Sequence, residues 1–354
     1  LLFIYQFLLF KIMSTKHTSS MKAFQEKYNL SFSNFFTIGS NPKIEKNNKI
    51  ENIPTACLML LNTDKACSSK GSCAQVCLIA SGNPVYYANK MKCRIRRNNA
   101  LMADYIDVDK FKTDSMFLRY LVINSFRFYA KNRSSKTIAY RMNGVSDWSF
   151  EKFAIKLTKE DTDYIQKAFN IYIEPIEYKN VFEAINKGLD LELNQSCSIK
   201  TQYYDYTKKL NRNFSLARSL NYHLTLSHGS SEDTFLKAIE LGLNYAAAFN
   251  LKKSEPLPKT FTYRGRKLSV IDGDLTDCRF LDINTSTHIV GLRFKIVKNQ
   301  DNAKKLEFCI DTTKEDIDNI KYSKLIDIVK TNEKMNTLYQ LKGMEYIKEL
   351  SVKY

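Results

Sequence analysis

The sequence lacks the short motifs of several common enzyme classes. It contains no G-x-S-x-G turn of the serine hydrolases, no Walker A phosphate loop and no glycine-rich dinucleotide fingerprint. Histidine is also scarce, with four in the chain. His17 lies in a polar segment and His223 inside a predicted strand, whereas His228 and His288 lie near predicted strand ends without a clear partner. The missing motifs disfavour those three enzyme classes.

The chain has little apolar sequence that suits a membrane or an export signal. Its first ten residues, LLFIYQFLLF, are apolar, but a helix that spans a bilayer needs about 20 such residues. They also lack the basic leading region and the cleavage site of a signal peptide. Because the chain begins with leucine and Met13 and Met21 follow, we interpret the first dozen residues as preceding the true start codon. We expect no membrane association, and a reducing compartment for the eight cysteines.

Acidic residues are in the minority. The chain has 37 Asp and Glu against 54 Lys and Arg, which gives a net charge of +17 and an isoelectric point near 9.3. A surface of this kind attracts polyanions, so nucleic acid or a nucleotide is the predicted partner. The alternative is compositional, because Lys far outnumbers Arg and Asn, Ile, Tyr and Phe are abundant, as in proteins of AT-rich genomes.

Short apolar runs rich in strand-forming residues alternate with stretches of helical periodicity from about residue 55 onward. This alternation predicts βαβ units and a largely parallel sheet. We therefore predict an α/β fold in the form of an irregular or partial (β/α) barrel with parallel strands, and a doubly wound open sheet is the alternative. The predicted strands are 56–61, 137–142, 169–174, 198–204, 222–226, 244–249, 268–271 and 288–292, and the predicted helices are 84–106, 112–131, 149–168, 179–189, 208–219 and 231–242.

Composition divides the chain into three predicted regions. Residues 1–35 are polar apart from their apolar start and are predicted to form a tail. Residues 36–310 form the barrel-like domain. Residues 311–354 are rich in lysine, with apolar residues at helical spacing, and are predicted to form a basic helical extension.

Three cysteines stand close together at Cys67, Cys73 and Cys77, directly after the first predicted strand. Thiolates bunched on a loop in a reducing compartment are typical of metal sites. These three fit a [4Fe–4S] cluster with one iron left open, or a zinc site completed by Cys57, Cys93 or a distant histidine. A set of thiols that binds no metal is the third alternative. The C-x5-C-x3-C spacing matches no standard zinc ribbon.

Polar residues follow several of the predicted strands. In parallel α/β folds, ligands bind at the carboxyl ends of the strands, where loops vary without disturbing the core. We therefore predict a catalytic face at these ends. The candidate residues are Asn143, Ser146, Asp147, Tyr206, Lys208, Ser227, Asp272, Asp274 and Asp277.

Each of these groups also has a structural interpretation. Asp272, Asp274 and Asp277 are close enough to share a divalent cation, but Asp-Gly-Asp is also a common turn sequence. The segment that contains Asp147 fits either a binding role or the cap of the following helix. Lys208 fits either anion binding or an exposed helix start.

The first predicted helix, 84–106, carries a cluster of basic residues that includes Lys90, Arg94 and Arg97. One interpretation is a face that contacts nucleic-acid phosphates. The other is an ordinary solvated helix face.

Several ordered segments resemble a known family. They are GSNPK (39–43), CAQVC (73–77), the Arg97-Asn98 pair, RMNGVSDWSFE (141–151), YYDYTKKLNR (203–212), NYHLTLSHGSSE (221–232), VIDGDLTDCRFLD (270–282) and IVGL (289–292). Over roughly residues 36 to 295 the chain resembles the bacteriophage "gene product eighty-eight" family, which has no settled activity. The resemblance implies a phage or mobile-element origin and shared site positions. Since an export signal is not found, the expected location is the cytoplasm of the host cell.

The cysteine loop is also similar to the cluster loop of radical-SAM-like barrels, which follows the first strand. Its spacing is wider than their C-x3-C-x2-C, which puts binding of S-adenosylmethionine in doubt.

These observations lead to two main functional hypotheses. The first is a radical-SAM-like enzyme with an iron–sulfur centre on the cysteine loop that acts on a nucleotide or nucleic acid. The second is a nucleic-acid-binding, replication-associated phage protein in which the cysteines hold structural zinc. A metal-dependent nuclease that uses the three aspartates between 272 and 277 is a third, weaker hypothesis.

Overall fold

The computed structural model describes most of the chain between residues 19 and 311. The described residues are 19–38, 42–77, 84–107, 110–193, 200–282, 288–295 and 308–311. The predicted helical extension, apart from residue 311, and the first 18 residues of the predicted tail lie outside them. In the described part of the tail, residues form two short helices, α2 (Ser19–Tyr28) and α3 (Phe32–Phe35).

The chain divides into two compact units, which we describe one at a time. The first comprises residues 1–67, 82–205 and 212–223, and the second comprises residues 68–81, 206–211 and 224–354. The largest sheet among the described residues has eight strands in the order β1-β4-β7-β8-β9-β12-β11-β10. Its two end strands, β1 and β10, do not pair with each other. The predicted α/β class and largely parallel sheet are confirmed, and the described strands do not close into a barrel.

The first unit contains the parallel strands β1 (Thr55–Cys57), β4 (Thr137–Arg141) and β7 (Lys200–Thr207). Strands that run parallel need crossover connections, and helices supply them. These helices are α5 (Pro84–Met102), α6 (Met116–Lys131), α7 (Lys159–Phe169) and α8 (Val181–Leu193), with α4 (Pro42–Glu51) before β1 and α9 (Phe214–Ser219) after β7.

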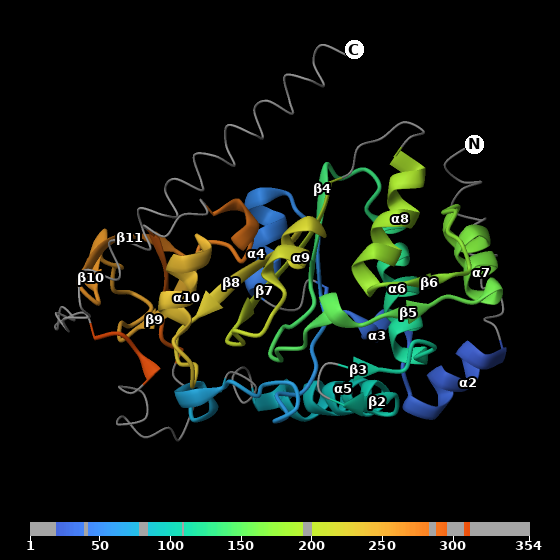
Figure 1. The fold of residues 1–354 in the computed structure, drawn as a ribbon, viewed down its shortest axis with the longest axis horizontal. Coiled ribbons are helices and arrows are strands. Elements are labelled where there is room, and N and C mark those ends of the chain that lie inside the picture. Colours follow the sequence, from blue (N-terminus) through green and yellow to red (C-terminus); the bar gives the residue numbers. More distant parts are fainter. Residues whose placement is uncertain are drawn as a thin grey trace, which may run out of the picture. The chain divides into compact units, whose positions relative to one another are not determined.

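Helix α6 is the central helix of this unit. Twelve of its residues are buried, and it contacts α7 and α8 (Figure 1). Its start is fixed by Ser115, whose hydroxyl accepts a hydrogen bond from the backbone N–H of Leu118. Arg119 of α6 makes a paired contact with the carboxylate of Asp161 in α7 at 2.7 and 2.9 Å. Apolar burial with one well-formed ion pair thus joins these two helices.

Two small antiparallel pairs complete the first unit, and sequence patterns missed both. They are β2 (Tyr105–Asp107) with β3 (Lys110–Phe111), and β5 (Ile155–Lys156) with β6 (Glu177–Tyr178). The strand predicted at 169–174 is wrong. Helix α7 continues to Phe169 and ends at Asn170, which has a left-handed conformation with φ of 56°. The next residues alternate between buried and exposed side chains, as a strand does, but form no ladder.

The second unit contains β8 (Tyr222–Ser227), of which residues 224–227 belong to it, together with β9 (Tyr245–Phe249), β10 (Thr260–Tyr263), β11 (Arg266–Asp272) and β12 (His288–Arg293). Strands β8, β9, β12 and β11 pair in parallel, whereas β10 pairs antiparallel with β11. The hairpin turns at Arg264 and Gly265, both with positive φ (49° and 72°). Helix α10 (Thr234–Leu241) connects β8 to β9.

No described helix combines the length and the apolar character that crossing a membrane requires.

Candidate active site

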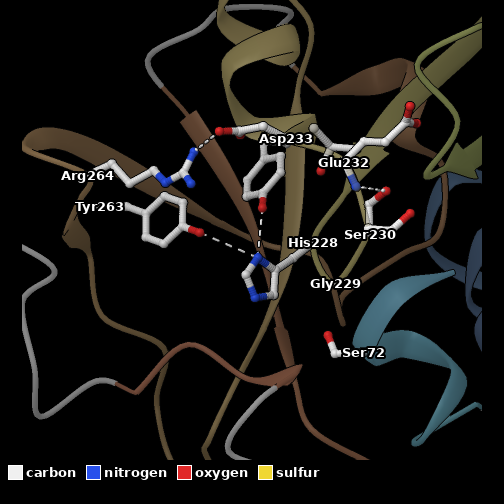
Figure 2. A pocket seen from close by; sticks show the side chains of 11 residues that line it. Ser72, His228, Gly229, Ser230, Glu232, Asp233, Tyr263 and Arg264 are labelled. Atoms are coloured by element: carbon white, nitrogen blue, oxygen red, sulfur yellow. Dashed lines mark hydrogen bonds and ion pairs between the residues drawn. The ribbon is translucent and has the colours of Figure 1, made fainter. Parts of the chain in front are cut away.

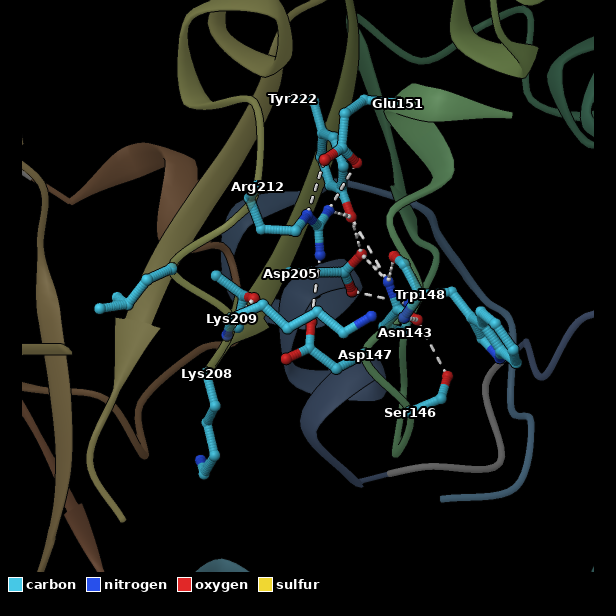
Figure 3. Close-up of polar contacts among 12 residues, drawn as sticks. Asn143, Ser146, Asp147, Trp148, Glu151, Asp205, Lys208, Lys209, Arg212 and Tyr222 are labelled. Carbon is cyan, nitrogen blue, oxygen red and sulfur yellow. Dashed lines mark hydrogen bonds and ion pairs between the residues drawn. The ribbon is translucent and has the colours of Figure 1, made fainter. Parts of the chain in front are cut away.

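Asn143 is the centre of a buried polar network in the first unit (Figure 3). It lies two residues after the end of β4. Its backbone N–H donates to Asp205 Oδ1 at 2.8 Å, and its side-chain amide donates to Asp205 Oδ2 at 3.1 Å and to the carbonyl of Trp148 at 2.9 Å. Its Oδ1 accepts from the Ser146 hydroxyl at 2.9 Å and from the Trp148 N–H at 2.8 Å. Because the amide nitrogen and oxygen are both used, aspartate cannot replace this asparagine without losing donors.

Asp205 is fully buried in β7 and accepts these two hydrogen bonds together with one from the Tyr222 hydroxyl. Burial raises the pKa of Asp205 to about 7, and the hydrogen bonds and the positive charges of Arg141 and Arg212 offset only part of that effect. A carboxyl group in this position is therefore divided between its protonated and ionised forms near neutral pH.

Arg212 is the buried cation of the same network. Its Nε and Nη2 donate to the two oxygens of Glu151 at 2.8 Å each, and its Nη1 donates to Asp147 Oδ1 at 3.0 Å. Nη2 also donates to the Tyr222 hydroxyl at 3.1 Å. Burial alone would lower the pKa of Arg212, but the carboxylates of Glu151 and Asp147, with Tyr222, raise it well above its ordinary value.

Burial explains why Asp205 holds a proton so readily, and the positive charges of Arg141 and Arg212 offset only part of its effect. Glu151 and Asp147 already contact Arg212, so one buried guanidinium faces two carboxylates before Asp205 is counted. Ionising Asp205 would add a third buried negative charge to the network, which is costly. Burial and the neighbouring Asp205 raise the pKa of Tyr222 well above its ordinary value, so its hydroxyl stays protonated and donates to Asp205.

The loop between β4 and β5 is held in place by aromatic packing. Trp148 is fully buried, and its ring lies edge-on to Phe111 and Phe153 at centroid distances of 5.4 and 6.2 Å. A short 3₁₀ helix, η3 (Phe150–Lys152), follows and places Glu151 beside Arg212. The sequence NGVSDWSFE thus folds back so that residues at both of its ends contact the same network.

Sequence patterns found part of this network and missed part. Asn143, Ser146 and Asp147 were predicted and do lie together (Figure 3). Asp205 was not among the predicted residues, although it directly follows the strand predicted at 198–204; in the structure it lies inside β7, which continues to Thr207. The remaining members, Glu151, Arg212 and Tyr222, lie inside the family-like segments 141–151, 203–212 and 221–232, which were the one signal that could have found them.

Lys208 and Ser227, also predicted, meet in the second unit, where Lys208 Nζ donates to Ser227 Oγ at 2.8 Å. Tyr206 is partly buried there as well. These three residues belong to the second unit, whereas the Asn143 network belongs to the first.

The predicted aspartate cluster faces an arginine. Arg293 Nη1 lies 3.1 Å from Asp272 Oδ2 and 3.3 Å from Asp274 Oδ2. Asp272 Oδ1 also accepts from the backbone N–H of Asp274 at 2.9 Å, which is the geometry of a local turn. Asp277 is fully buried. These three carboxylates form no metal-holding group in the described structure.

The cysteine loop forms no disulfide among the described cysteines, which exclude Cys197. Within the described ranges, no group of three or more His, Cys, Asp and Glu side chains is placed to hold a metal ion. The metal centre at Cys67, Cys73 and Cys77 therefore stays a prediction from the spacing.

On the predicted phosphate-contacting helix α5, Lys90 is exposed, but Arg94 and Arg97 are buried. Arg97 donates to the backbone carbonyls of Met59, at 3.2 Å, and Asn34. Burial lowers its pKa to about 10. In this conformation two of the three predicted phosphate contacts are directed into the first unit.

A comparison with known protein families identifies the chain. The family model described as Gene product 88 matches residues 31–312. The chain belongs to the Gene product 88 family. This confirms the predicted bacteriophage family, and the matched region contains every residue of the Asn143 network. The comparison lends no support to the radical-SAM-like resemblance of the cysteine loop. No curated protein and no solved structure matches the chain.

Proposed function

We propose that this member of the Gene product 88 family is an enzyme in which the fully buried Asp205 exchanges a proton with the substrate through its hydrogen-bonded neighbours, at the carboxyl ends of β4 and β7. The observation that carries the proposal is the hydrogen-bonded carboxyl group of Asp205, whose burial raises its pKa to about 7. General acid–base catalysis works best when the pKa of the catalytic group lies near the working pH. Strongly perturbed carboxyl groups are also concentrated at functional sites.

The neighbours of Asp205 have distinct roles in this proposal. Asn143 fixes the orientation of the carboxyl group through two donors. Tyr222 donates to Asp205 and accepts from Arg212, so it links the acid to the buried cation. When Asp205 gives up its proton, the carboxylate that forms keeps these donors, and they stabilise the new charge. Asp147 and Glu151 hold Arg212 in place.

The proposed substrate is a nucleotide or a nucleic acid. The net charge of +17 supports it, because a strongly basic protein attracts polyanions at long range.

The test is a turnover screen with Asp205→Asn. Purified full-length protein is incubated with ribonucleotides, deoxynucleotides and oligonucleotides, and products are detected by mass spectrometry. Loss of a general acid–base group typically costs about 10² to 10⁴ in rate. We expect the wild-type product to fall by at least the lower figure in Asp205→Asn and to persist in Asp163→Asn, a change at an exposed site. Equal turnover by a folded Asp205→Asn protein would refute the acid–base role.

The metal-centred hypotheses are separate proposals. Iron, sulfide and zinc analysis of anaerobically purified protein distinguishes an iron–sulfur centre from structural zinc on Cys67, Cys73 and Cys77. A protein that contains none of these after reconstitution removes both. Mg²⁺- or Mn²⁺-dependent cleavage that persists in Asp274→Asn would remove the nuclease proposal.

The nucleic-acid-binding alternative rests on the same net charge of +17. It predicts DNA affinity that falls steeply with salt, since each phosphate contact releases counterions. Little binding at low ionic strength would count against it.

A further inference from the structure

The second unit contains a pocket of about 350 Å³ that no functional prediction included (Figure 2). Ser72 comes from the cysteine loop, and His228 and Ser230 come from the connection between β8 and α10. Tyr245 of β9 and Tyr263 of β10 supply aromatic faces. Sites for small molecules are typically of this size or larger and combine aromatic walls with a few polar groups.

The two loops that form the pocket are fastened to each other. The Ser230 hydroxyl donates to the carbonyl of Ser69 at 3.0 Å, and the Cys73 N–H donates to the carbonyl of Gly229 at 3.2 Å. Gly71 has φ of +44°, and a Cβ there would lie 2.4 Å from the backbone of Ser230. The cysteine loop and the β8–α10 connection therefore fit closely only with glycine at this position, and the pocket is preformed.

The two ring nitrogens of His228 differ in their contacts with the described residues. Nδ1 lies 2.7 Å from the Tyr245 hydroxyl and 3.5 Å from the Tyr263 hydroxyl. Nε2 makes no hydrogen bond with any described residue, and Figure 2 shows it on the side of the ring away from Tyr263. A hydroxyl group can donate or accept, so the contact at Nδ1 is compatible with a neutral ring that carries its proton on Nε2, and Nε2 is then a donor.

Two positive side chains, Lys208 and Arg264, act on His228. Burial is the main cause that lowers the pKa of His228 to about 4, and these two charges add to it. Unlike burial, the two positive charges also favour an anion beside the ring. A neutral ring can donate a hydrogen bond to an anion, although the ring itself carries no charge.

The two carboxylates of the pocket are already engaged. Asp233 contacts Arg264 and accepts from the N–H of Leu236 at the start of α10. Glu232 accepts from the Ser69 hydroxyl at 3.1 Å and from the Leu210 N–H at 3.4 Å. Both carboxylates therefore bind other parts of the protein. The groups of the pocket that can donate to a ligand are then the hydroxyl groups and the imidazole ring.

We propose that this pocket binds the phosphate group of a small phosphate monoester, with His228 Nε2–H and the Ser72 hydroxyl as donors. The Ser72 hydroxyl, like His228 Nε2, bonds to no described residue. The proposal does not depend on the chemistry of Asp205, which belongs to the other unit.

The probes are inorganic phosphate and adenosine monophosphate, titrated into the full-length protein by calorimetry and by NMR of ¹³C-labelled histidine rings. We expect saturable binding of both, competition between them and a shift of the His228 resonance. His228→Ala should weaken binding about tenfold or more, as expected for loss of a hydrogen bond to a charged group. Ser72→Ala should weaken it less.

Two controls keep the test decisive. His288→Gln alters a histidine of β12 outside the pocket and should leave affinity unchanged. His228→Gln keeps an amide donor, so it should bind more tightly than His228→Ala if donation is the role. Binding of neither probe at millimolar concentration, binding of adenosine monophosphate that phosphate does not compete with, or unchanged affinity in folded His228→Ala would each overturn the proposal.

Discussion

The Asn143 network and the His228 pocket differ in how far their buried polar groups bond to one another. In the Asn143 network, side chains saturate one another: Arg212 alone donates four hydrogen bonds, and Asp205 accepts three. In the pocket, the carboxylates are engaged, but one nitrogen of His228 bonds to none of the described residues. Burial favours the neutral form in both, so it raises the pKa of Asp205 to about 7 and lowers that of His228 to about 4. The saturated centre is suited to holding a proton, and the open one to holding a ligand.

The largest expected effect is on the saturated centre. Glu151→Ala leaves the buried guanidinium of Arg212 without its two-point partner, so we expect a loss of about 3–5 kcal/mol in the free energy of unfolding. Denaturant unfolding measures it. Asp163→Ala, which breaks an exposed pair with Lys159, is the control and should cost less than about 1 kcal/mol. Similar costs at the two sites would show that the network is not saturated by strong contacts.

The second prediction concerns Asp205 and pH. Its folded pKa of about 7 lies above the ordinary value of 3.8, so between these values the folded state binds the extra proton. Stability should therefore fall as pH rises from 4 to 7, by up to about 1.4 kcal/mol per pH unit from this group. Unfolding measured at pH 5 and pH 7 should show a weaker fall in Asp205→Asn. The same slope in both proteins would mean that Asp205 titrates normally.

His228 should give the opposite slope. Its folded pKa of about 4 lies below the ordinary value of 6.5, so the unfolded state binds the extra proton between these values. Its contribution to stability rises with pH over this range and is lost as pH falls. Because the ring is only partly buried, we expect a contribution of about 1–2 kcal/mol in total. His228→Gln should remove this contribution from the pH profile of unfolding, and an unchanged profile would contradict a neutral His228 ring in the folded protein.

The smallest effect is expected at the rim of the pocket. Arg264→Ala removes a partly exposed contact with Asp233, and we expect a change of less than about 1 kcal/mol in the free energy of unfolding. The same variant should raise the pKa of His228, because one of the positive charges that lower it is gone. Histidine-ring NMR titration reads this directly. A fixed His228 pKa would remove Arg264 as a source of the positive field.

Local sequence patterns predicted many elements of the fold, and they failed where the assignment of a strand depends on pairing with another strand. The alternation of apolar runs and helical periodicity predicted the α/β class, and β4, β9 and β12 lie close to their predicted positions. The predicted strand at 169–174 has the alternating burial of a strand, with Ile171 and Ile173 buried, but forms no ladder. The alternation of apolar and polar residues indicates that one face of a segment is buried, but it does not indicate whether another strand pairs with that segment.

The same limit applies to the candidate site. Asn143, Ser146 and Asp147 lie within five residues of one another, so the sequence of a single loop is enough to predict them together. Their partners lie far along the chain: Asp205 is 62 residues from Asn143, and Arg212 is 61 from Glu151. The pocket likewise joins Ser69 to Ser230, which are 161 residues apart.

The sequence by itself determined the family, the α/β class and the loop that carries Asn143, because each depends on residue types and spacings within short segments. Tertiary structure alone decided the charge state of the two centres. The pKa of Asp205 follows from full burial beside Tyr222, and the pKa of His228 from burial near Lys208 and Arg264. Burial and long-range neighbours exist only once the chain is folded, so no local pattern encodes the proton that Asp205 holds or the one that His228 lacks.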